Sequence, residues 1–406
     1  MEKVTKNVNQ ITEGVIWKQL LIFFFPIAVG TLFQQLYNTA DAIIVGRFLG
    51  KEALASVGGS AAMLTGLVIG FFTGLSSGAA VVVSQFYGAE DEKNLHDSLH
   101  TAYAFSVIVS ILVAVFGYIF TPHMLTAMKT PAELMPDAVL YLRIYFLGML
   151  PVLIFNMGSG IMRAIGDSKK PLYYLIVCCF VNIGLDLLFV VIFKMGVAGA
   201  AFATILAQVA SAVLVTYSLM FSYDHVKLHL REIRATASIL KHELKIGLPS
   251  GLQACMYSFT NLVIQSAINT LGTDTTAAWA AFGKVDAIYW TICTALGISI
   301  TTFAGQNYGA KRLDRVFKSV KVGLALLLTL GGGILLILVL NSRFLFGFFT
   351  TDTNVVDIGA KMLVTLAPSY IIYVFVEVYS GGLRGMGDVM IPTIITIAGV
   401  CCVRIP

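Results

Sequence analysis

The chain has 406 residues, of which 57% are hydrophobic and 12% are charged, and its mean hydropathy is +0.85. Soluble globular proteins usually have about a quarter of their residues charged. This composition therefore excludes a soluble enzyme or binding domain and indicates an integral membrane protein. The net charge of +5 does not predict a nucleic-acid partner, because the basic residues lie in short segments between apolar runs.

The amino-terminal segment, residues 1–14, is polar and lacks the apolar stretch and small-residue cleavage site of a secretory signal. We therefore expect it to be retained. The six cysteines all lie within apolar runs and follow neither zinc-binding nor disulfide spacing. We expect them to be free thiols that pack as small apolar side chains.

Continuous apolar runs follow one another along the chain, and most reach the roughly 20 residues that a membrane-spanning helix needs. They lack the apolar–polar alternation of a transmembrane barrel strand. The runs are 20–46, 54–84, 98–120, 138–162, 172–193, 197–221, 246–270, 277–305, 319–340 and 358–382, and an eleventh begins at Ile391. This last run is still apolar at Pro406, so we expect the chain to be a fragment of a longer protein.

The distribution of Lys and Arg predicts the orientation. If the amino terminus is cytoplasmic, the inner segments contain eighteen of the 27 basic residues and the outer segments contain seven. Basic residues are enriched in cytoplasmic loops. We therefore expect a multi-pass protein of the cell inner membrane with a cytoplasmic amino terminus.

An internal repeat divides the chain into halves. The segment RAIGD at 163–167 recurs as RGMGD at 384–388, and QFYGA at 85–89 recurs as QNYGA at 306–310, in both cases 221 residues later. Six helices per half is an even number, so the halves share one orientation and are related by an axis along the membrane normal. The sequence predicts an all-α membrane protein with a six-helix lobe at 1–222, a basic cytoplasmic linker at 223–245 and an incomplete lobe at 246–406, about eleven helices of twelve.

The run QQLYNTADAIIVGRFLG at 34–50, the two repeated motifs and the terminal VRIP resemble the multidrug and toxic compound extrusion (MATE) family, and most closely its DinF-like branch. The resemblance covers essentially the whole chain. It implies twelve helices in two lobes and the exchange of Na⁺ or H⁺ for bulky, often cationic drugs and dyes. It also implies that Asp41, Asn182, Asp186 and Thr204 form the cation site of the amino-terminal lobe, and that Pro26 kinks the first helix.

The residues themselves point to the same place. Asp41 is an acid inside the first span, and a charged group in such a position is by default a functional-site candidate. Asn182 and Asp186 are four residues apart and share a helix face, and at 1.5 Å per residue Thr204 lies at nearly the depth of Asp186. Carboxylate, amide and hydroxyl oxygens are hard ligands suited to Na⁺, and a dry pair of carboxyl groups could instead take up a proton. Alternatively, Asp41 is a solvated helix end and Asn182 a helix-packing residue.

The second half offers different candidates, because Asn261 occupies the place of Asp41 in the repeat. Asp286 and Glu377 are possible substrate contacts, as are Tyr37 and Asn38 in the first half. Asp286 could instead pair with Lys284, and Glu377 could instead face a water-filled cavity. Pro26 removes a helix hydrogen bond and predicts a bend, which we interpret as a candidate gating hinge.

The histidine pairs at 96/100 and 225/229 are spaced four residues apart in polar connections. We interpret them as solvated helix faces rather than metal ligands, because no acidic third ligand lies nearby in the sequence. No phosphate-binding glycine motif is present, so we expect no cofactor and no enzymatic activity.

The sequence thus predicts a monomeric, cation-coupled efflux antiporter that resides in the lipid bilayer and takes small-molecule drugs or dyes as substrates. The alternative is a flippase for a lipid-linked saccharide with the same two-lobed layout, which would favour a cavity lined by Arg and Lys. A channel subunit or scaffold would not depend on the intramembrane carboxylates.

Overall fold

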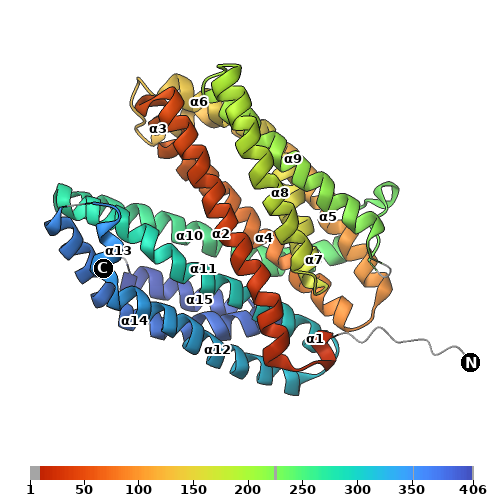
Figure 1. Ribbon diagram of the computed structural model, residues 1–406. Coiled ribbons are helices and arrows are strands. Elements are labelled where there is room, and N and C mark those ends of the chain that lie inside the picture. The colour runs from red at the N-terminus through yellow and green to blue at the C-terminus, as the bar shows by residue number, and fades with distance from the viewer. Residues whose placement is uncertain (1–9, 224–225, 351, 405–406) are drawn as a thin grey trace, which may run out of the picture. The chain divides into compact units, whose positions relative to one another are not determined.

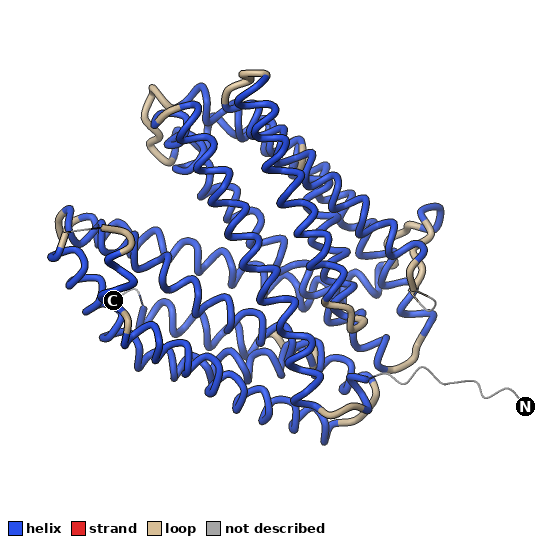
Figure 2. The backbone as a smooth tube through the Cα atoms, viewed as in Figure 1, coloured by secondary structure: helices blue, strands red, loops and turns tan. Residues whose placement is uncertain are grey.

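The computed structural model describes residues 10–223, 226–350 and 352–404. Within these residues the chain is helical, with short connections and no strand (Figures 1 and 2). Eight helices are long and apolar enough to cross a membrane, and a bent pair would make a ninth. Large apolar side chains remain exposed along these helices, among them Phe180 at 65% and Val213 at 60%, as expected of surfaces that face lipid. The prediction of an all-α polytopic membrane protein is confirmed.

The chain divides into two compact units. The amino-terminal unit is Val29–Ser258, and the carboxy-terminal unit combines Met1–Ala28 with Phe259–Pro406. Two helices are shared between the units: α2 (Ile16–Leu49) and α10 (Ala237–Asn269). The division of α2 falls just after Pro26, the residue predicted to bend this helix. The lobe boundaries predicted from the repeat stay a prediction.

The amino-terminal unit is built from helices that follow one another closely along the chain. Besides its parts of α2 and α10, it contains α3 (Lys51–Ser56), the π-helical turn η1 (Val57–Ala61), α4 (Ala62–Gly88), α5 (Glu92–Ala127), α6 (Met135–Leu147), α7 (Met149–Ala164), α8 (Lys169–Asp186), the π-helical turn η2 (Leu187–Ile192), α9 (Val197–Phe221) and the 3₁₀ turn η3 (Leu230–Glu232).

One run expected as a single helix is bent. Residues 138–162 form parts of α6 and α7, which meet at Gly148 with an angle of 52°. Pro151 stands in the first turn of α7, where it removes the amide that would bond the carbonyl of Leu147. A Cβ at Gly148 would lie 2.3 Å from the Ile205 side chain. The bend therefore has a sequence cause at Pro151 and a packing requirement at Gly148.

Helices α4 and α10 cross at very short range within the amino-terminal unit. Gly74 and Gly78 of α4 face Gly247 and Gly251 of α10, and a Cβ at Gly78 would lie 2.4 Å from the backbone nitrogen of Gly247. Small residues four apart allow helix backbones to approach closely in membranes. This pair of glycine motifs positions the first half of α10 in the unit.

The carboxy-terminal unit contains the amino-terminal part of α2 and the end of α10. Its other elements are α1 (Gln10–Glu13), α11 (Thr273–Gly309), α12 (Leu313–Leu340), α13 (Ser342–Gly347), α14 (Thr353–Gly385), α15 (Met390–Gly399) and the π-helical turn η4 (Val400–Arg404). Its core includes Phe23, Leu296, Phe303 and Leu363, all nearly inaccessible to solvent.

The predicted repeat is visible in the backbone. In RAIGD the amide of Gly166 donates to Arg163 O at 3.0 Å, and in RGMGD the amide of Gly387 donates to Arg384 O at 2.9 Å. Both glycines have positive φ, 99° and 90°, a conformation that glycine adopts without steric cost. The QFYGA and QNYGA segments likewise end helices α4 and α11 with matching hydrogen bonds, Ala89 N to Gln85 O and Ala310 N to Gln306 O, each 2.9 Å long.

Candidate functional site

Asp41 lies in the second half of α2, in the amino-terminal unit, one helical turn after Tyr37. Its side chain is half-buried, and its Oδ1 atom is buried without a hydrogen-bond partner among the described residues. An unpartnered oxygen of this kind is unfavourable, because the atom has lost its hydration without a replacement. The alternative of a solvated helix end does not fit this burial.

Asn182 and Asp186 lie on α8, and both are fully buried with 0% exposure. In the part of the chain that the structure describes, neither amide atom of Asn182 and neither carboxylate oxygen of Asp186 has a hydrogen-bond partner. Asp186 is the last residue of α8 before the π-helical turn η2. Such turns occur often at functional sites, because they change the direction of the side chains that follow.

The two acids, far apart in the sequence, meet in the fold. The carboxyl groups of Asp41 and Asp186 lie close enough to interact electrostatically. Two carboxylates that face each other away from water repel strongly, because the low dielectric does not screen them. The pair is therefore stable only when a proton or a metal cation neutralises part of its charge.

Tyrosines surround this acidic pair. Tyr37 on α2 and Tyr141 on α6 both lie within electrostatic reach of Asp41, and Tyr141 is also within reach of Asp186. Tyr145 follows Tyr141 one turn later, with the two ring centroids 6.1 Å apart. The sequence analysis did not select Tyr141 or Tyr145, although their spacing of four residues was a signal that they share a helix face.

Thr204 is the fourth residue of the predicted site. It lies on α9, which packs against α8, and is 4% exposed. Its hydroxyl donates to Ala200 O at 3.0 Å. The hydroxyl proton is therefore used within α9, while the oxygen keeps lone pairs that can accept or coordinate.

This set of groups fits a small hard cation. Carboxylate, amide and hydroxyl oxygens are the ligands that hard cations prefer, and five polar atoms of Asp41, Asn182 and Asp186 are buried without partners. A proton shared by the carboxyl groups would relieve the same repulsion. The arrangement therefore suits either Na⁺ or H⁺.

Asp286 is in the carboxy-terminal unit and has partners of its own. Its Oδ2 accepts from Trp290 Nε1 at 2.7 Å, and its Oδ1 accepts from the hydroxyl of Tyr370. Lys284 is exposed. The contacts of Asp286 therefore lie with aromatic hydrogen-bond donors, and not with Lys284 as the charge-pair interpretation expected.

Glu377 is also partnered. Its Oε2 accepts from Tyr373 at 3.0 Å, and its Oε1 forms an ion pair with Arg384 Nη2 at 3.3 Å. Its side chain is 15% exposed and that of Arg384 is 23% exposed. Arg384 belongs to the repeated RGMGD motif, so the motif supplies the charge that neutralises Glu377.

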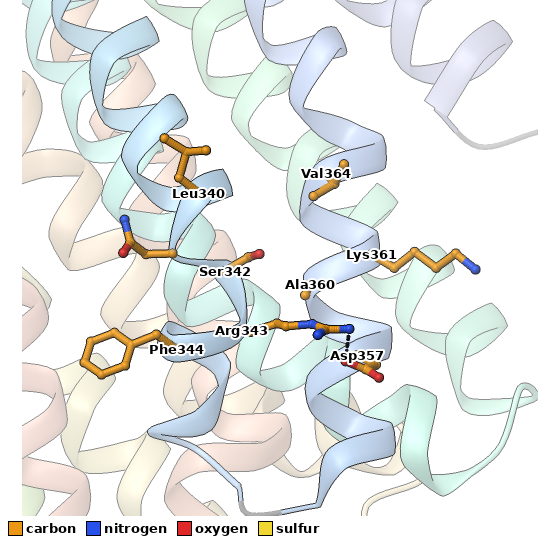
Figure 3. Close-up of a pocket in the computed structure, with 9 residues that line it drawn as sticks. Leu340, Ser342, Arg343, Phe344, Asp357, Ala360, Lys361 and Val364 are labelled. Atoms are coloured by element: carbon orange, nitrogen blue, oxygen red, sulfur yellow. Dashed lines mark ion pairs between the residues drawn. The ribbon is translucent and has the colours of Figure 1, made fainter.

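The remaining predicted residues lie at separate places. Asn38 is exposed on α2, and Pro26 is within the same helix. A hollow of about 690 Å³ lies in the carboxy-terminal unit, lined by the end of α12, α13 and the start of α14, with an ion pair of 3.0 Å between Arg343 and Asp357 (Figure 3). None of the predicted site residues lines this hollow.

The interpretation of the histidine pairs was wrong in one respect. An acidic group does lie nearby, because Glu232 Oε2 is 3.0 Å from His96 Nε2. His100 is also buried, with 1% exposure, and is not part of a solvated helix face. The linker folds back onto the start of α5, which the spacing of residues along the chain did not reveal.

Comparison with known proteins identifies the family. The family model described as MatE matches residues 26–188 and 249–406, which is most of the chain. The chain belongs to the MatE family. The two matched segments begin at Pro26 and Pro249 and thus follow the internal repeat. Members of this family are ion-coupled membrane transporters and not enzymes.

Similar proteins cover the MatE chain almost completely. The probable multidrug resistance protein YoeA of Bacillus subtilis (strain 168) is 28% identical over 96% of this chain and 86% of its own. The probable multidrug resistance protein YpnP of the same organism is 30% identical over 75% of this chain and 68% of its own. A solved outward-facing structure of a multidrug resistance MATE family transporter has a TM-score of 0.90 at 24% identity, covering 100% of this chain and 90% of that chain.

Proposed function

We propose that this MatE protein exports bulky, cationic organic compounds through the cell inner membrane in exchange for Na⁺ or H⁺. Its relatives YoeA and YpnP carry names of multidrug resistance proteins, which supports drugs or dyes as the substrate class. We further propose that the amino terminus is cytoplasmic, because most basic residues lie in the segments on that side.

The observation that carries the proposal is the unpartnered acidic pair. Asp41 and Asp186 interact with each other, and together with Asn182 they present five buried polar atoms without partners. We assign the coupling cation to these residues, with Thr204 as a neighbouring oxygen ligand on α9. When bound, the cation supplies the positive charge that two facing carboxylates need.

Exchange follows if the cation and the substrate stabilise different conformations. A ligand shifts a conformational equilibrium only by its difference in affinity for the two states. We propose that the cation enters from outside and favours the state that releases substrate outward. Pro26 is the proposed hinge, because proline interrupts the hydrogen bonding of α2 next to the boundary between the two units.

The flippase alternative receives no support from the basic residues that the sequence offered for it. Lys284 is exposed, and Arg404 donates to the side chain of Asn261 at 2.7 Å within the carboxy-terminal unit. Arg384 is paired with Glu377.

The test uses everted vesicles that contain the protein, with any missing carboxy-terminal segment restored. Movement of a fluorescent cationic dye is followed under a Na⁺ gradient and then under a proton gradient. We expect one gradient to drive the dye in the wild type and Asp357→Asn, an exposed-acid control, but not in Asp186→Asn at equal expression. Dye movement that is indifferent to both gradients and to Asp186→Asn would contradict the proposal.

A further inference from the structure

A cluster of histidines lies where the segment between α9 and α10 folds back onto α5. His96 and His100 are one turn apart near the start of α5, and Glu232 ends the 3₁₀ turn η3. One potential ligand atom from each residue lies within 4.8 Å of the other two. The three residues all belong to the amino-terminal unit, and none takes part in the proposed coupling site.

The contacts within the cluster are already close. Glu232 Oε2 is 3.0 Å from His96 Nε2, and the ring centroids of His96 and His100 are 4.0 Å apart. The ring of His229 lies 6.2 Å from His96 and 6.3 Å from His100. Three imidazoles and a carboxylate thus share one small volume.

The hydrogen bonds of His100 define its tautomer. Its Nε2 is 3.0 Å from the backbone amide of His229 and must accept this bond, so it carries a lone pair. Its Nδ1 then carries the proton and donates to His96 O at 2.7 Å. Metal-binding histidines typically donate one ring N–H to such a carbonyl, which orients the other nitrogen toward the metal. His100 is therefore held in the form that a metal ligand requires.

We propose that His96, His100 and Glu232 bind a divalent transition-metal ion such as Zn²⁺. Two imidazole nitrogens and one carboxylate oxygen form a three-ligand set that zinc uses, with a water molecule in the fourth position. Nickel and copper ions also favour imidazole ligands.

Binding needs only a small contraction of the cluster. With zinc–nitrogen bonds of about 2.0–2.1 Å, tetrahedral ligands lie roughly 3.3 Å from one another, which the His96–Glu232 contact of 3.0 Å approaches. The side chains of His96 and Glu232 are 37% and 56% exposed, so they are free to close around an ion held by the buried His100. The metal takes the place of the His229 amide at His100 Nε2.

The surrounding contacts explain what the metal would stabilise. Arg234 pairs with Asp97 at 3.4 Å, and the amide of Thr236 donates to Thr101 Oγ1 at 3.1 Å. These bonds already hold the segment after Glu232 against α5. The bound metal adds a stronger connection between the same two elements and so fixes the start of the chain that leads into α10.

The test measures metal binding by the purified full-length protein in detergent. Isothermal titration with Zn²⁺ is expected to show one ion per chain, and His96→Asn or Glu232→Gln is expected to weaken binding by about tenfold or more. His123→Asn is the matched control, because His123 is near the opposite end of the same helix. Thermal unfolding without metal establishes that each variant is folded.

A second measurement separates this site from the six free cysteines. Co²⁺ bound by nitrogen and oxygen ligands gives visible d–d bands without the thiolate charge-transfer bands of cysteine ligation, and we expect that spectrum to be lost in His96→Asn. The proposal is overturned if the wild type binds no stoichiometric metal. It is equally overturned if His96→Asn and Glu232→Gln bind metal as tightly as the wild type, or if the spectrum shows thiolate ligands.

Discussion

The two units of this MatE protein treat their buried acids in opposite ways. In the amino-terminal unit, Asp41 and Asp186 face each other, and three of their four oxygens are buried without a hydrogen-bond partner. In the carboxy-terminal unit, Asp286 accepts from two aromatic donors and Glu377 is paired with Arg384. A satisfied acid stabilises its own surroundings, whereas an unsatisfied pair is costly until a ligand binds. The comparison teaches that the ligand site belongs to the amino-terminal unit.

The repeat shows how this difference arose within one architecture. The backbone turns at Gly166 and Gly387 are equivalent, but the position of Asp41 is taken by Asn261 in the second half. Asn261 accepts a hydrogen bond from Arg404 at 2.7 Å. The helical scaffold is thus shared between the halves, while the unpartnered carboxyl pair is found in one of them among the described residues.

The largest expected effect is the loss of coupling at the acidic pair. Asp41→Asn removes one of two charges that hold the cation, so we expect gradient-driven dye export to fall by about 5- to 150-fold, the usual range of a coupling between ligands. The double variant Asp41→Asn with Asp186→Asn should lose little more, because residues of one site act non-additively. Equal, multiplying losses in vesicle assays would argue that the two acids act at separate sites.

A smaller and different effect is expected at the partnered acid. Glu377→Gln leaves the guanidinium of Arg384 without its carboxylate in a mostly buried position, so the free energy of unfolding should fall by about 2 kcal/mol, between the values for exposed and buried pairs. Denaturation of the purified protein measures this loss. The ion dependence of transport should be unchanged, and a changed ion dependence would place Glu377 in the coupling machinery. Arg384→Met in the same chain should recover stability, since it removes the unpaired charge.

The packing beneath Glu377 gives a third test. A Cβ at Gly297 would lie 2.0 Å from Glu377 Oε1, so Gly297→Ala must displace the carboxylate from Arg384. We expect a loss of about 1–3 kcal/mol in unfolding free energy, as for overpacked interiors. Gly283→Ala on the same helix is the control, because it meets no atom within 4 Å and should stabilise the helix by roughly 0.5–1 kcal/mol. Similar behaviour of both variants would argue against the close contact.

The smallest effect concerns Glu243, at the start of α10 ahead of the apolar run that begins at residue 246. Glu243 is 4% exposed, its Oε1 lacks a partner among the described residues, and burial raises its pKa to about 8. The folded protein therefore holds a proton that the unfolded chain releases near pH 4.5. Stability contributed by this proton is complete below that pH and is lost as the pH rises toward 8.

Thermal unfolding at pH 5 and pH 9 tests this prediction. The wild type should lose more thermal stability between these values than Glu243→Gln, which carries no titrating group. An identical pH dependence in the two proteins would mean that Glu243 is already ionised in the folded state. As a single acid without a second carboxyl beside it, Glu243 is not expected to affect coupling.

The helices and the repeat could be predicted from the sequence, because long apolar runs and repeated glycine turns are local signals. Asp41 and Asp186 could be selected because charges are rare in such runs. The partners of Asp286 could not, since Tyr370 is 84 residues away and a helix that is apolar on all sides does not reveal which face contacts which neighbour. The approach of Glu232 to His96 was missed for the same reason, because it depends on how a polar segment folds back.

The most direct test of the central claim is chemical labelling of the acids by a hydrophobic carbodiimide, which reacts with protonated carboxyl groups in membranes. Labelled peptides of the purified protein are identified by mass spectrometry with and without Na⁺ and over a range of pH. We expect label at Asp41 or Asp186, protection by the coupling cation if that cation is Na⁺, and little label at Asp286 or Glu377. Label confined to Asp286 and Glu377, with none at Asp41 or Asp186, would contradict the assignment of the coupling site to the amino-terminal unit.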